Sequence, residues 1–183
     1  GEGLADARQC NVANAASVGA AVEATAAAHR RIDILVNNAG IAHVGTIEQT
    51  TPEDLDRLYA VNVRGLFLCS RAAVEIMLPQ GGGVILNMAS IASLVGVPER
   101  FAYSMTKAAL NQLTVLLAKS CGPVRVNAVA PGLVATPWTA DWEAQHKAVA
   151  AVAPLHRSAT PEDIAEAVVS FVRTRYASGA ILE

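Results

Sequence analysis

Two kinds of apolar segment alternate along the chain. Short runs rich in Val, Ile and Leu are separated by longer segments with helical spacing. The short runs are nearly continuous in apolar residues, which is typical of strands that are buried on both faces of a sheet. Alternation of strand and helix requires parallel pairing through crossover helices. The sequence therefore predicts an open α/β fold with a doubly wound parallel sheet.

Two short tetrapeptides support this division into elements. Thr-Pro-Glu-Asp occurs at 51–54 and again at 160–163, and each copy puts a Thr cap before a Pro, with acidic residues in the first helical turn. We therefore interpret these acids as helix caps and not as catalytic groups. The predicted strands are 32–36, 84–87 and 124–129, with weaker candidates at 9–12 and 180–182; the predicted helices are about 15–30, 52–78, 103–120 and 161–173, with a short one at 138–152.

Composition narrows the class of protein. The 183 residues amount to one domain, and a hydrophobic content of 52% allows a sizeable core. The net charge is −2 and no basic run occurs, which argues against nucleic-acid binding. No apolar run reaches the ~20 residues of a membrane helix. Three cysteines without CxxC spacing and four scattered histidines predict neither a disulfide framework nor a metal site. We therefore expect a cytoplasmic protein with no membrane or nucleic-acid partner.

A tyrosine and a lysine four residues apart carry the clearest chemical signal. Tyr103 and Lys107 stand near the start of a predicted helix and share one of its faces. A free tyrosine has a pKa of about 10, and a neighbouring ammonium lowers that pKa because it favours the phenolate. The pair therefore suits proton exchange with an alcohol or a carbonyl oxygen.

Small and polar residues follow the predicted strands. Ser90 follows the strand at 84–87, where its hydroxyl could donate to the same oxygen as Tyr103 or could simply cap a turn. Small residues at 38–40 permit close approach of a flat ligand to the backbone. Asn62 lies inside a long apolar helix, where a kink or a buried hydrogen bond would also explain it.

These motifs occur in an order that resembles the classical short-chain dehydrogenases/reductases. The set is Asn-Asn-Ala-Gly at 37–40, Asn62, Ser90, Tyr-x-x-x-Lys at 103–107 and Pro-Gly-x-x-x-Thr at 131–136. The resemblance covers nearly the whole chain. It implies one Rossmann-like dinucleotide-binding domain over residues 1–183, NAD or NADP as cofactor, and interconversion of a secondary alcohol and a ketone. A 3-oxoacyl compound or a cyclic ketone would be the usual substrate in such a family.

The resemblance also implies a role for each matching residue. Tyr103 would be the acid/base, Lys107 would lower its pKa and hold the nicotinamide ribose, and Ser90 would polarise the carbonyl. Asn62 would hold a water that links Lys107 to bulk solvent. The implied cofactor-binding residues are Asn11 and Val12 at the adenine, Asn38, Ala39 and Gly40 along the adenosine ribose, and Pro131, Gly132, Val134 and Thr136 over the nicotinamide, together with Tyr103 and Lys107.

Parts of the family's pattern are absent from the sequence. There is no Thr-Gly-x-x-x-Gly-x-Gly turn to cradle a pyrophosphate at a helix N-terminus, and the run of glycines at 81–83 precedes a strand and predicts an ordinary turn. The strand whose end discriminates NAD from NADP and the Asp-Gly-Gly after the last strand are missing too. We therefore expect a domain that lacks its first β-α-β piece and its extreme C-terminus, with a central strand missing beside 32–36, and not a self-sufficient enzyme.

Other interpretations of the chain stay open. Residues 132–160 follow a strand's carboxyl end and contain Pro breaks, so we interpret them as a substrate lid, although Trp138 and Trp142 could equally pack under a loop. Surplus apolar residues on the long helices, among them Leu66, Phe67, Leu110 and Leu116, predict a homo-oligomer, either dimer or tetramer. The alternative functions are an extended-branch epimerase or dehydratase and a truncated homologue that acts as a non-catalytic interaction subunit.

Overall fold

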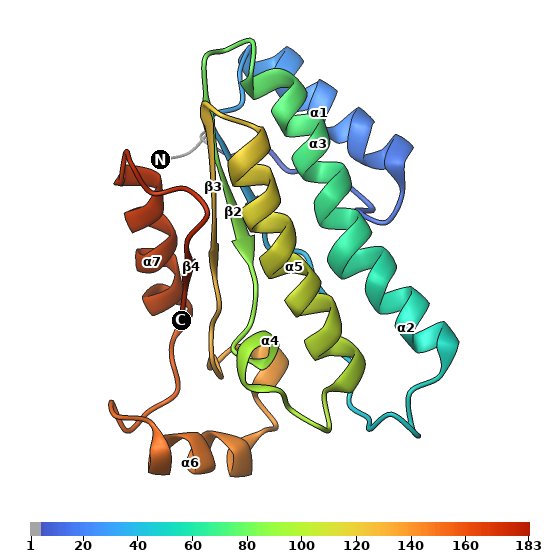
Figure 1. Cartoon of the computed structure of the whole chain (residues 1–183), viewed down its shortest axis with the longest axis vertical. Coiled ribbons are helices and arrows are strands. Elements are labelled where there is room, and N and C mark those ends of the chain that lie inside the picture. Colours follow the sequence, from blue (N-terminus) through green and yellow to red (C-terminus); the bar gives the residue numbers. More distant parts are fainter. Residues whose placement is uncertain (1–4) are drawn as a thin grey trace.

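The computed structural model describes residues 5–183, which form a parallel four-stranded sheet with helices on both faces (Figure 1). The strands are β1 (Ile34–Asn37), β2 (Gly83–Met88), β3 (Val124–Val129) and β4 (Ile181–Leu182), and they lie side by side in that order. All three neighbouring pairs are parallel. The predicted α/β class and doubly wound parallel sheet are therefore confirmed.

Helices connect the strands and cover both faces. Figure 1 shows α3 and α5 against one face of the sheet, with α1 outside α3, and α7 against the other face. The helices are α1 (Ala15–His29), α2 (Pro52–Tyr59), the π-helix η1 (Ala60–Gly65), α3 (Leu66–Met77), α4 (Ala92–Val95), α5 (Phe101–Ser120), the 3₁₀ helix η2 (Pro137–Thr139), α6 (Glu143–Val152) and α7 (Pro161–Arg173).

The two Thr-Pro-Glu-Asp segments are helix caps, as predicted. Thr51 caps α2 and Thr160 caps α7, and in each case the Thr side chain accepts from the backbone of the third helical residue while the Asp side chain accepts from the Thr backbone N–H. These reciprocal bonds satisfy helix-end donors that would otherwise have no partner. The carboxylates of Asp54 and Asp163 therefore take part in helix capping.

Two predicted strands differ from the structure by two residues or more, whereas 84–87 and 180–182 differ by no more than one residue at either end. β1 begins at Ile34 and not at Ile32, because the side chain of Gln80 accepts from the Ile32 N–H at 2.9 Å and donates to the Ile32 carbonyl at 2.8 Å in place of a strand. Residues 9–12 form no strand. The Asn11 side chain accepts from the backbone N–H of Ala13 at 3.0 Å, and the resulting turn leads into α1.

The single helix predicted at 52–78 is observed as one continuous helical segment whose middle turn is π-helical and not α-helical. α2 runs into η1, which has the wider π-helical turn, and η1 runs into α3. A π-helical segment inside an α-helix often accompanies a functional site. Asn62, which is poorly suited to a helix interior, lies inside this segment and is 1% exposed.

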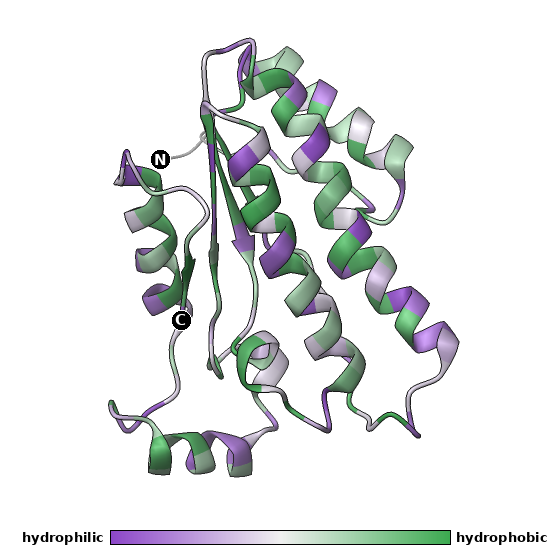
Figure 2. Ribbon diagram, viewed as in Figure 1, coloured by the Kyte–Doolittle hydropathy of each residue, from purple (hydrophilic) through white to green (hydrophobic). Residues whose placement is uncertain are grey.

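The core has two layers, one on each face of the sheet, and Figure 2 shows hydrophobic residues along the strands and on the helix faces turned toward them. Alternate residues of β2 supply both layers: Ile85 packs with α3 and α5, whereas Val84 and Leu86 pack with Phe171 of α7. Of the apolar helix residues predicted to face a partner chain, Leu66 and Leu110 belong instead to the core, because each is at most 7% exposed. Phe67 and Leu116 do reach the surface.

β1 lies at an edge of the sheet. Its free side is not paired with another strand among residues 5–183, and its Ile34 and Val36 side chains are 46% and 43% exposed. Hydrophobic strand residues of a doubly wound sheet are normally covered on both faces. This edge is where the sequence predicted the neighbouring central strand. No helix among the described residues is both long and apolar enough to cross a membrane.

A network of hydrogen-bonded side chains links β1 and β2 to α3 and α5. Asn37 of β1 lies directly opposite Asn87 of β2 and donates to its side-chain oxygen at 2.9 Å. Asn87 in turn donates to the hydroxyl of Thr114 on α5 at 2.9 Å, and Asn37 donates to the hydroxyl of Ser70 on α3 at 3.0 Å. These bonds connect two strands to two helices near the strand ends. Since Asn87 and Thr114 are fully buried, water cannot replace the bonds.

Replacing Asn87 by Ala should lower the free energy of unfolding by about 1–3 kcal/mol, because it removes the two hydrogen bonds through which Asn87 joins Asn37 of β1 to Thr114 of α5. Urea unfolding of the full-length protein measures the change. Gln112→Ala, at an exposed position of α5, is the control and should change stability by less than about 0.5 kcal/mol. Equal stability of Asn87→Ala and the control would contradict the structural role of the network.

Candidate active site

Three loops meet at the carboxyl edge of the sheet. Parallel strands end at the same edge, so the segments that follow β1, β2 and β3 are brought together although the strands end at residues 37, 88 and 129. The N-terminal half of α5 passes beside this edge (Figure 1). Clefts outside the carboxyl ends of such strands are where open α/β sheets bind ligands.

Ser90 and Tyr103 meet at this edge. Ser90 follows the end of β2, and its side-chain oxygen accepts from the backbone N–H of Ala92 at 3.2 Å, which leaves its own O–H free to donate. Tyr103 lies in the first turn of α5. Burial raises the pKa of Tyr103, and this effect outweighs the hydrogen bond with Ser90 and the charge of Arg100, which both lower the pKa. The phenol therefore keeps its proton at neutral pH.

Lys107 lies one turn further along α5 and is 6% exposed. Its ammonium donates to the Met88 carbonyl at the end of β2 at 2.6 Å and lies 5.7 Å from the centre of the Tyr103 ring. Burial lowers the pKa of Lys107 to about 8. Burial acts on both groups and disfavours the charged form of each. That Lys107 lowers the pKa of Tyr103 stays a prediction.

Asn62 fixes the loop after β1 against α5. Its side-chain oxygen accepts from the Ile41 N–H at 2.9 Å, and its amide nitrogen donates to the Ile41 carbonyl at 2.9 Å and to the Thr106 hydroxyl at 3.1 Å. Thr106 also donates to the carbonyl of Tyr103 at 2.8 Å. The side chain of Asn62 is therefore fully used in positioning the backbone at 41 and the first turn of α5.

Gly40 leaves space beside the lysine. A β-carbon added at Gly40 would lie 3.4 Å from the side-chain oxygen of Asn62 and 3.6 Å from the ammonium nitrogen of Lys107. An ammonium has three N–H donors, and within residues 5–183 the Lys107 group uses one of them, toward Met88. The hydroxyls of a cofactor ribose fit such a space, because they would accept from the two remaining donors. Asn38 and Ala39 precede Gly40 and are exposed at the same edge.

Val12, which follows Asn11, lies against Gly65 of η1. A β-carbon at the buried Gly65 of η1 would come within 3.0–3.2 Å of Val12, so the glycine is what lets this turn approach the helix. The Asn11 side-chain oxygen already binds the Ala13 N–H, and its amide N–H₂ is left for an outside acceptor. An exposed amide of this kind fits a ring nitrogen of an adenine.

The loop after β3 adjoins the Ser90 turn. The carbonyl of Pro131 accepts from the Ile91 N–H at 3.0 Å, and Gly132 and the residues after it extend past the sheet edge. Val134 forms an isolated parallel bridge with Ala159, which joins the beginning and the end of the excursion that contains α6. Thr136 caps η2. The short helix predicted at 138–152 is observed as η2 and α6, because Thr136-Pro137 begins a separate turn.

The residues at 81–83 do not form a phosphate loop. Gly81 and Gly82 have φ angles of 87° and 143°, which glycine adopts readily, and they turn the chain from the end of α3 into β2. A pyrophosphate cradle requires the opposite order, a strand followed by a turn and a helix N-terminus. The described residues thus fit the ribose and nicotinamide side of a dinucleotide better than its pyrophosphate.

Arg100 and Asn111 are site residues that the sequence did not single out. Arg100 precedes α5 one turn before Tyr103, and its guanidinium carbon lies 4.5 Å from the centre of the Trp142 ring. Asn111 donates to the Ser93 hydroxyl at 2.8 Å, and Ser93 donates to the Ser90 carbonyl at 2.6 Å, which steadies the Ser90 turn. Arg100 could have been found from the sequence, because it precedes Tyr103 by three residues and such a spacing puts two side chains on the same face of a helix.

The buried ammonium of Lys107 makes stability depend on pH. The unfolded chain holds this proton up to a pKa of 10.5, but the folded chain releases it at about 8. Below pH 8 the burial penalty is fully present, and stability rises between pH 8 and 10.5 because the unfolded state then binds more protons. Relative to Lys107→Met, the full-length protein should therefore gain about 2 kcal/mol between pH 7 and 9.5 in urea unfolding. A difference that is constant with pH would contradict the buried charge.

Comparison with known proteins agrees with this geometry. Residues 2–182 match a family model described as enoyl-(acyl carrier protein) reductase. A 2-(R)-hydroxypropyl-CoM dehydrogenase of Xanthobacter autotrophicus is 41% identical over 95% of this chain and 74% of its own, and a 3α-hydroxysteroid dehydrogenase of Mediterraneibacter gnavus is 44% identical over 82% of this chain and 62% of its own. The chain thus spans 74% and 62% of the lengths of these two relatives.

The fold has solved counterparts as well. The crystal structure of a 3-ketoacyl-(acyl-carrier-protein) reductase from Brucella melitensis, complexed with NADH, superposes with a TM-score of 0.89 at 33% identity, covering 94% of this chain and 74% of that one. Ser90, Tyr103 and Lys107 stand together at the carboxyl edge of the matching sheet. From the family model, the relatives and the fold, the chain belongs to the classical short-chain dehydrogenase/reductase family.

Proposed function

We propose that the protein is an NAD(P)-dependent oxidoreductase that interconverts a secondary alcohol and a ketone. The observation that carries the proposal is the grouping of Ser90, Tyr103 and Lys107 at one sheet edge, with Asn62 positioning the adjoining backbone. A protonated phenol beside a free hydroxyl donor suits a carbonyl oxygen that becomes an alkoxide as it is reduced. The names of the relatives, two of them dehydrogenases of hydroxy compounds, support the same reaction class.

The proposed reaction divides the chemistry between cofactor and protein. A bound nicotinamide dinucleotide supplies the hydride. Ser90 donates a hydrogen bond to the carbonyl oxygen and holds it beside Tyr103. Tyr103 gives its proton to that oxygen, so that the ketone gains one hydride and one proton and becomes the alcohol. Lys107 holds the ribose hydroxyls through its two remaining donors, and a water near Asn62 restores the proton from solvent.

The roles of the cofactor-binding residues remain part of the proposal. Gly40 and Lys107 would hold the nicotinamide ribose, and Asn11 and Val12 would meet the adenine. Asn38 and Ala39 would lie along the adenosine ribose. Pro131, Gly132, Val134 and Thr136 would cover the nicotinamide. The described residues fit NAD and NADP equally, because the strand end that would discriminate between the two is not among them.

Two further proposals concern the surroundings of the site. Residues 132–160 would act as a lid, because their two ends are joined at Val134 and Ala159 while α6 between them has no buried residue. A homo-oligomer is supported by Phe67 on α3 and Leu116 on α5, which are 45% and 53% exposed on helices that cover the sheet. The cytoplasmic location expected from the sequence stays a prediction.

The alternatives make different demands on the site. An epimerase or dehydratase would also use Tyr103 and Lys107, but its substrate would be a nucleotide-sugar held by further residues. A non-catalytic subunit would need neither group. Acid/base catalysis by Tyr103 would exclude the non-catalytic alternative. Reduction of a simple ketone would distinguish the proposed function from an epimerase or dehydratase.

Replacing Tyr103 by Phe removes the phenolic proton and keeps the ring. If Tyr103 is the acid, kcat/KM for ketone reduction by the full-length protein should fall by about 10²–10⁴. Tyr59→Phe, at an exposed tyrosine of α2, is the matched control and should retain wild-type activity. Circular dichroism establishes that both variants fold. Near-wild-type turnover by folded Tyr103→Phe would remove the assignment.

Closure of the lid should be visible in hydrogen exchange. Without cofactor, amides at 136–159 should exchange faster than those of β2 and β3, because few of the segment's residues are buried. Addition of nicotinamide dinucleotide to the full-length protein should slow exchange in this segment as it closes over the site. Exchange that is unchanged at 136–159 while other segments gain protection would count against a lid.

A further inference from the structure

Arg100 stands on the substrate side of the candidate active site. Its carbonyl accepts from the Ser104 N–H at 2.8 Å, so it begins the first turn of α5, and residues 100, 103 and 107 fall on one side of that helix. At one end of this row the Lys107 ammonium is directed into the sheet, where it binds the Met88 carbonyl. Arg100 is at the other end, away from the sheet, with Tyr103 between the two.

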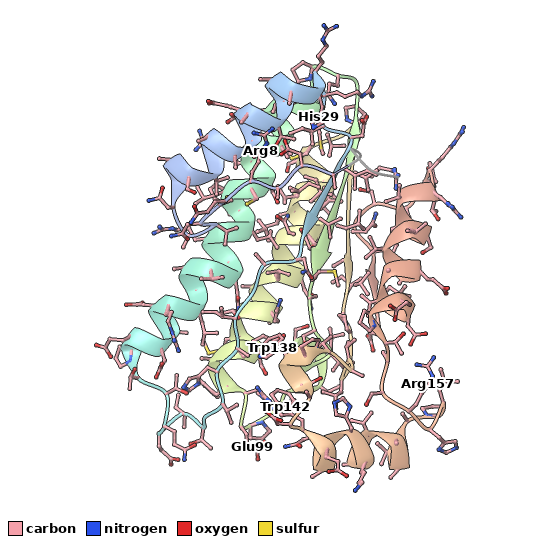
Figure 3. The ribbon with its side chains drawn as sticks, turned by 180° about the vertical axis from the view of Figure 1, so that it is seen from behind. Arg8, His29, Glu99, Trp138, Trp142 and Arg157 are labelled. Atoms are coloured by element: carbon pink, nitrogen blue, oxygen red, sulfur yellow. The ribbon has the colours of Figure 1, made fainter. Side chains whose placement is uncertain are left out.

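The Arg100 side chain connects the catalytic helix to the lid segment. Its guanidinium carbon lies 4.5 Å from the centre of the ring of Trp142, the residue directly before α6. Figure 3 shows Trp142 beside Glu99, the neighbour of Arg100, with Trp138 on the same side of the molecule. A guanidinium is attracted to the face of an indole, so the Trp142 ring fixes where the charge of Arg100 lies.

This guanidinium has no anionic partner among the residues that the structure describes. Within residues 5–183, no carboxylate oxygen lies within 4.0 Å of it and its side chain makes no hydrogen bond. Glu143, at the start of α6, is paired with Lys147 at 2.7 Å. Stacking uses the face of a guanidinium and leaves the N–H groups at its edge, which match the oxygens of carboxylate, sulfonate or phosphate groups.

The charge of Arg100 also reaches the catalytic phenol. It is one of the two influences that lower the pKa of Tyr103 against the larger effect of burial. Tyr103 stands between Lys107 and Arg100 on this face of α5, so a molecule held at Ser90 and Tyr103 that extends away from Lys107 extends toward Arg100 and Trp142. A group bound at Arg100 would therefore belong to the same molecule as the reacting carbonyl.

We propose that Arg100, stacked on Trp142, binds an anionic group of the substrate and selects ketones and alcohols that carry a carboxylate, sulfonate or phosphate close to the reacting carbon. The inference rests on the proposed function, since Tyr103 defines where the reacting carbon lies. It assigns Arg100 a part in substrate specificity, and it assigns Trp142 the task of holding the guanidinium.

A pair of substrates that differ only in charge tests the proposal. The full-length protein and Arg100→Met are compared with 3-oxobutanoate and with its neutral methyl ester. The ratio of kcat/KM for the acid to kcat/KM for the ester should fall at least ~10-fold in the variant, because a charge-assisted contact to the acid is lost. The activity toward the ester should fall less than the activity toward the acid, because the ester has no anionic group whose contact Arg100→Met could remove.

Two control variants distinguish recognition from a structural role. Lys147→Met removes an exposed cation from α6 and should leave the acid-to-ester ratio unchanged. Trp142→Leu removes the stacking surface and should lower the ratio in the same direction as Arg100→Met. If Arg100 only anchored the lid, Arg100→Met would reduce activity toward acid and ester equally, and that result would overturn the proposal.

A binding measurement separates failure of this proposal from failure of the proposed function. Tryptophan fluorescence is titrated with 3-oxobutanoate in the presence of oxidised nicotinamide dinucleotide, so that no reduction takes place. Binding that is lost in Arg100→Met supports the anion site even if the protein reduces no ketone. Binding and reduction that are the same for acid and ester in both proteins would overturn the anion site and leave the oxidoreductase function standing.

Discussion

Parallel pairing of β1, β2 and β3 is the constraint on which the candidate site depends. Asn37 lies opposite Asn87, and Asn87 lies opposite Ala128, so the three strands end level with one another. The buried side chain of Asn87 reinforces this alignment, because it binds Asn37 on one side and Thr114 of α5 on the other. The same residues that hold the sheet together therefore bring α5 to its carboxyl edge.

The chemistry at that edge follows from burial as much as from residue identity. Tyr103 and Lys107 share a helix face, and burial disfavours the charged form of both, which raises one pKa and lowers the other. The phenol is thus held ready to donate a proton, and the pKa of the Lys107 ammonium is lowered to about 8. Arg100, partly stacked on Trp142, supplies the positive charge on the opposite side of the phenol.

Much of this arrangement could be predicted from the sequence. The apolar runs gave β3 at its observed bounds and the duplicated caps gave the starts of α2 and α7, because buried strands and capped helices have local signals. The length of β1 could not be predicted, since it is set by Gln80, 48 residues away from Ile32. The pKa of Tyr103 and the contact between Arg100 and Trp142 depend on burial and on long-range packing, which spacing along the chain does not reveal.

If Ser90, Tyr103 and Lys107 form a site for hydride transfer to a ketone, the hydrogen that the cofactor loses must appear on the carbon of the product alcohol. The full-length protein is incubated with a ketone and with reduced nicotinamide dinucleotide that carries deuterium at C4 of the nicotinamide. The cofactor is labelled on one face of the nicotinamide ring at a time. With one of the two labelled cofactors, mass spectrometry and NMR should find one deuterium on the carbinol carbon of the product for each cofactor molecule oxidised. Turnover that leaves no deuterium on that carbon with either labelled cofactor, or no turnover with any ketone, would contradict the account.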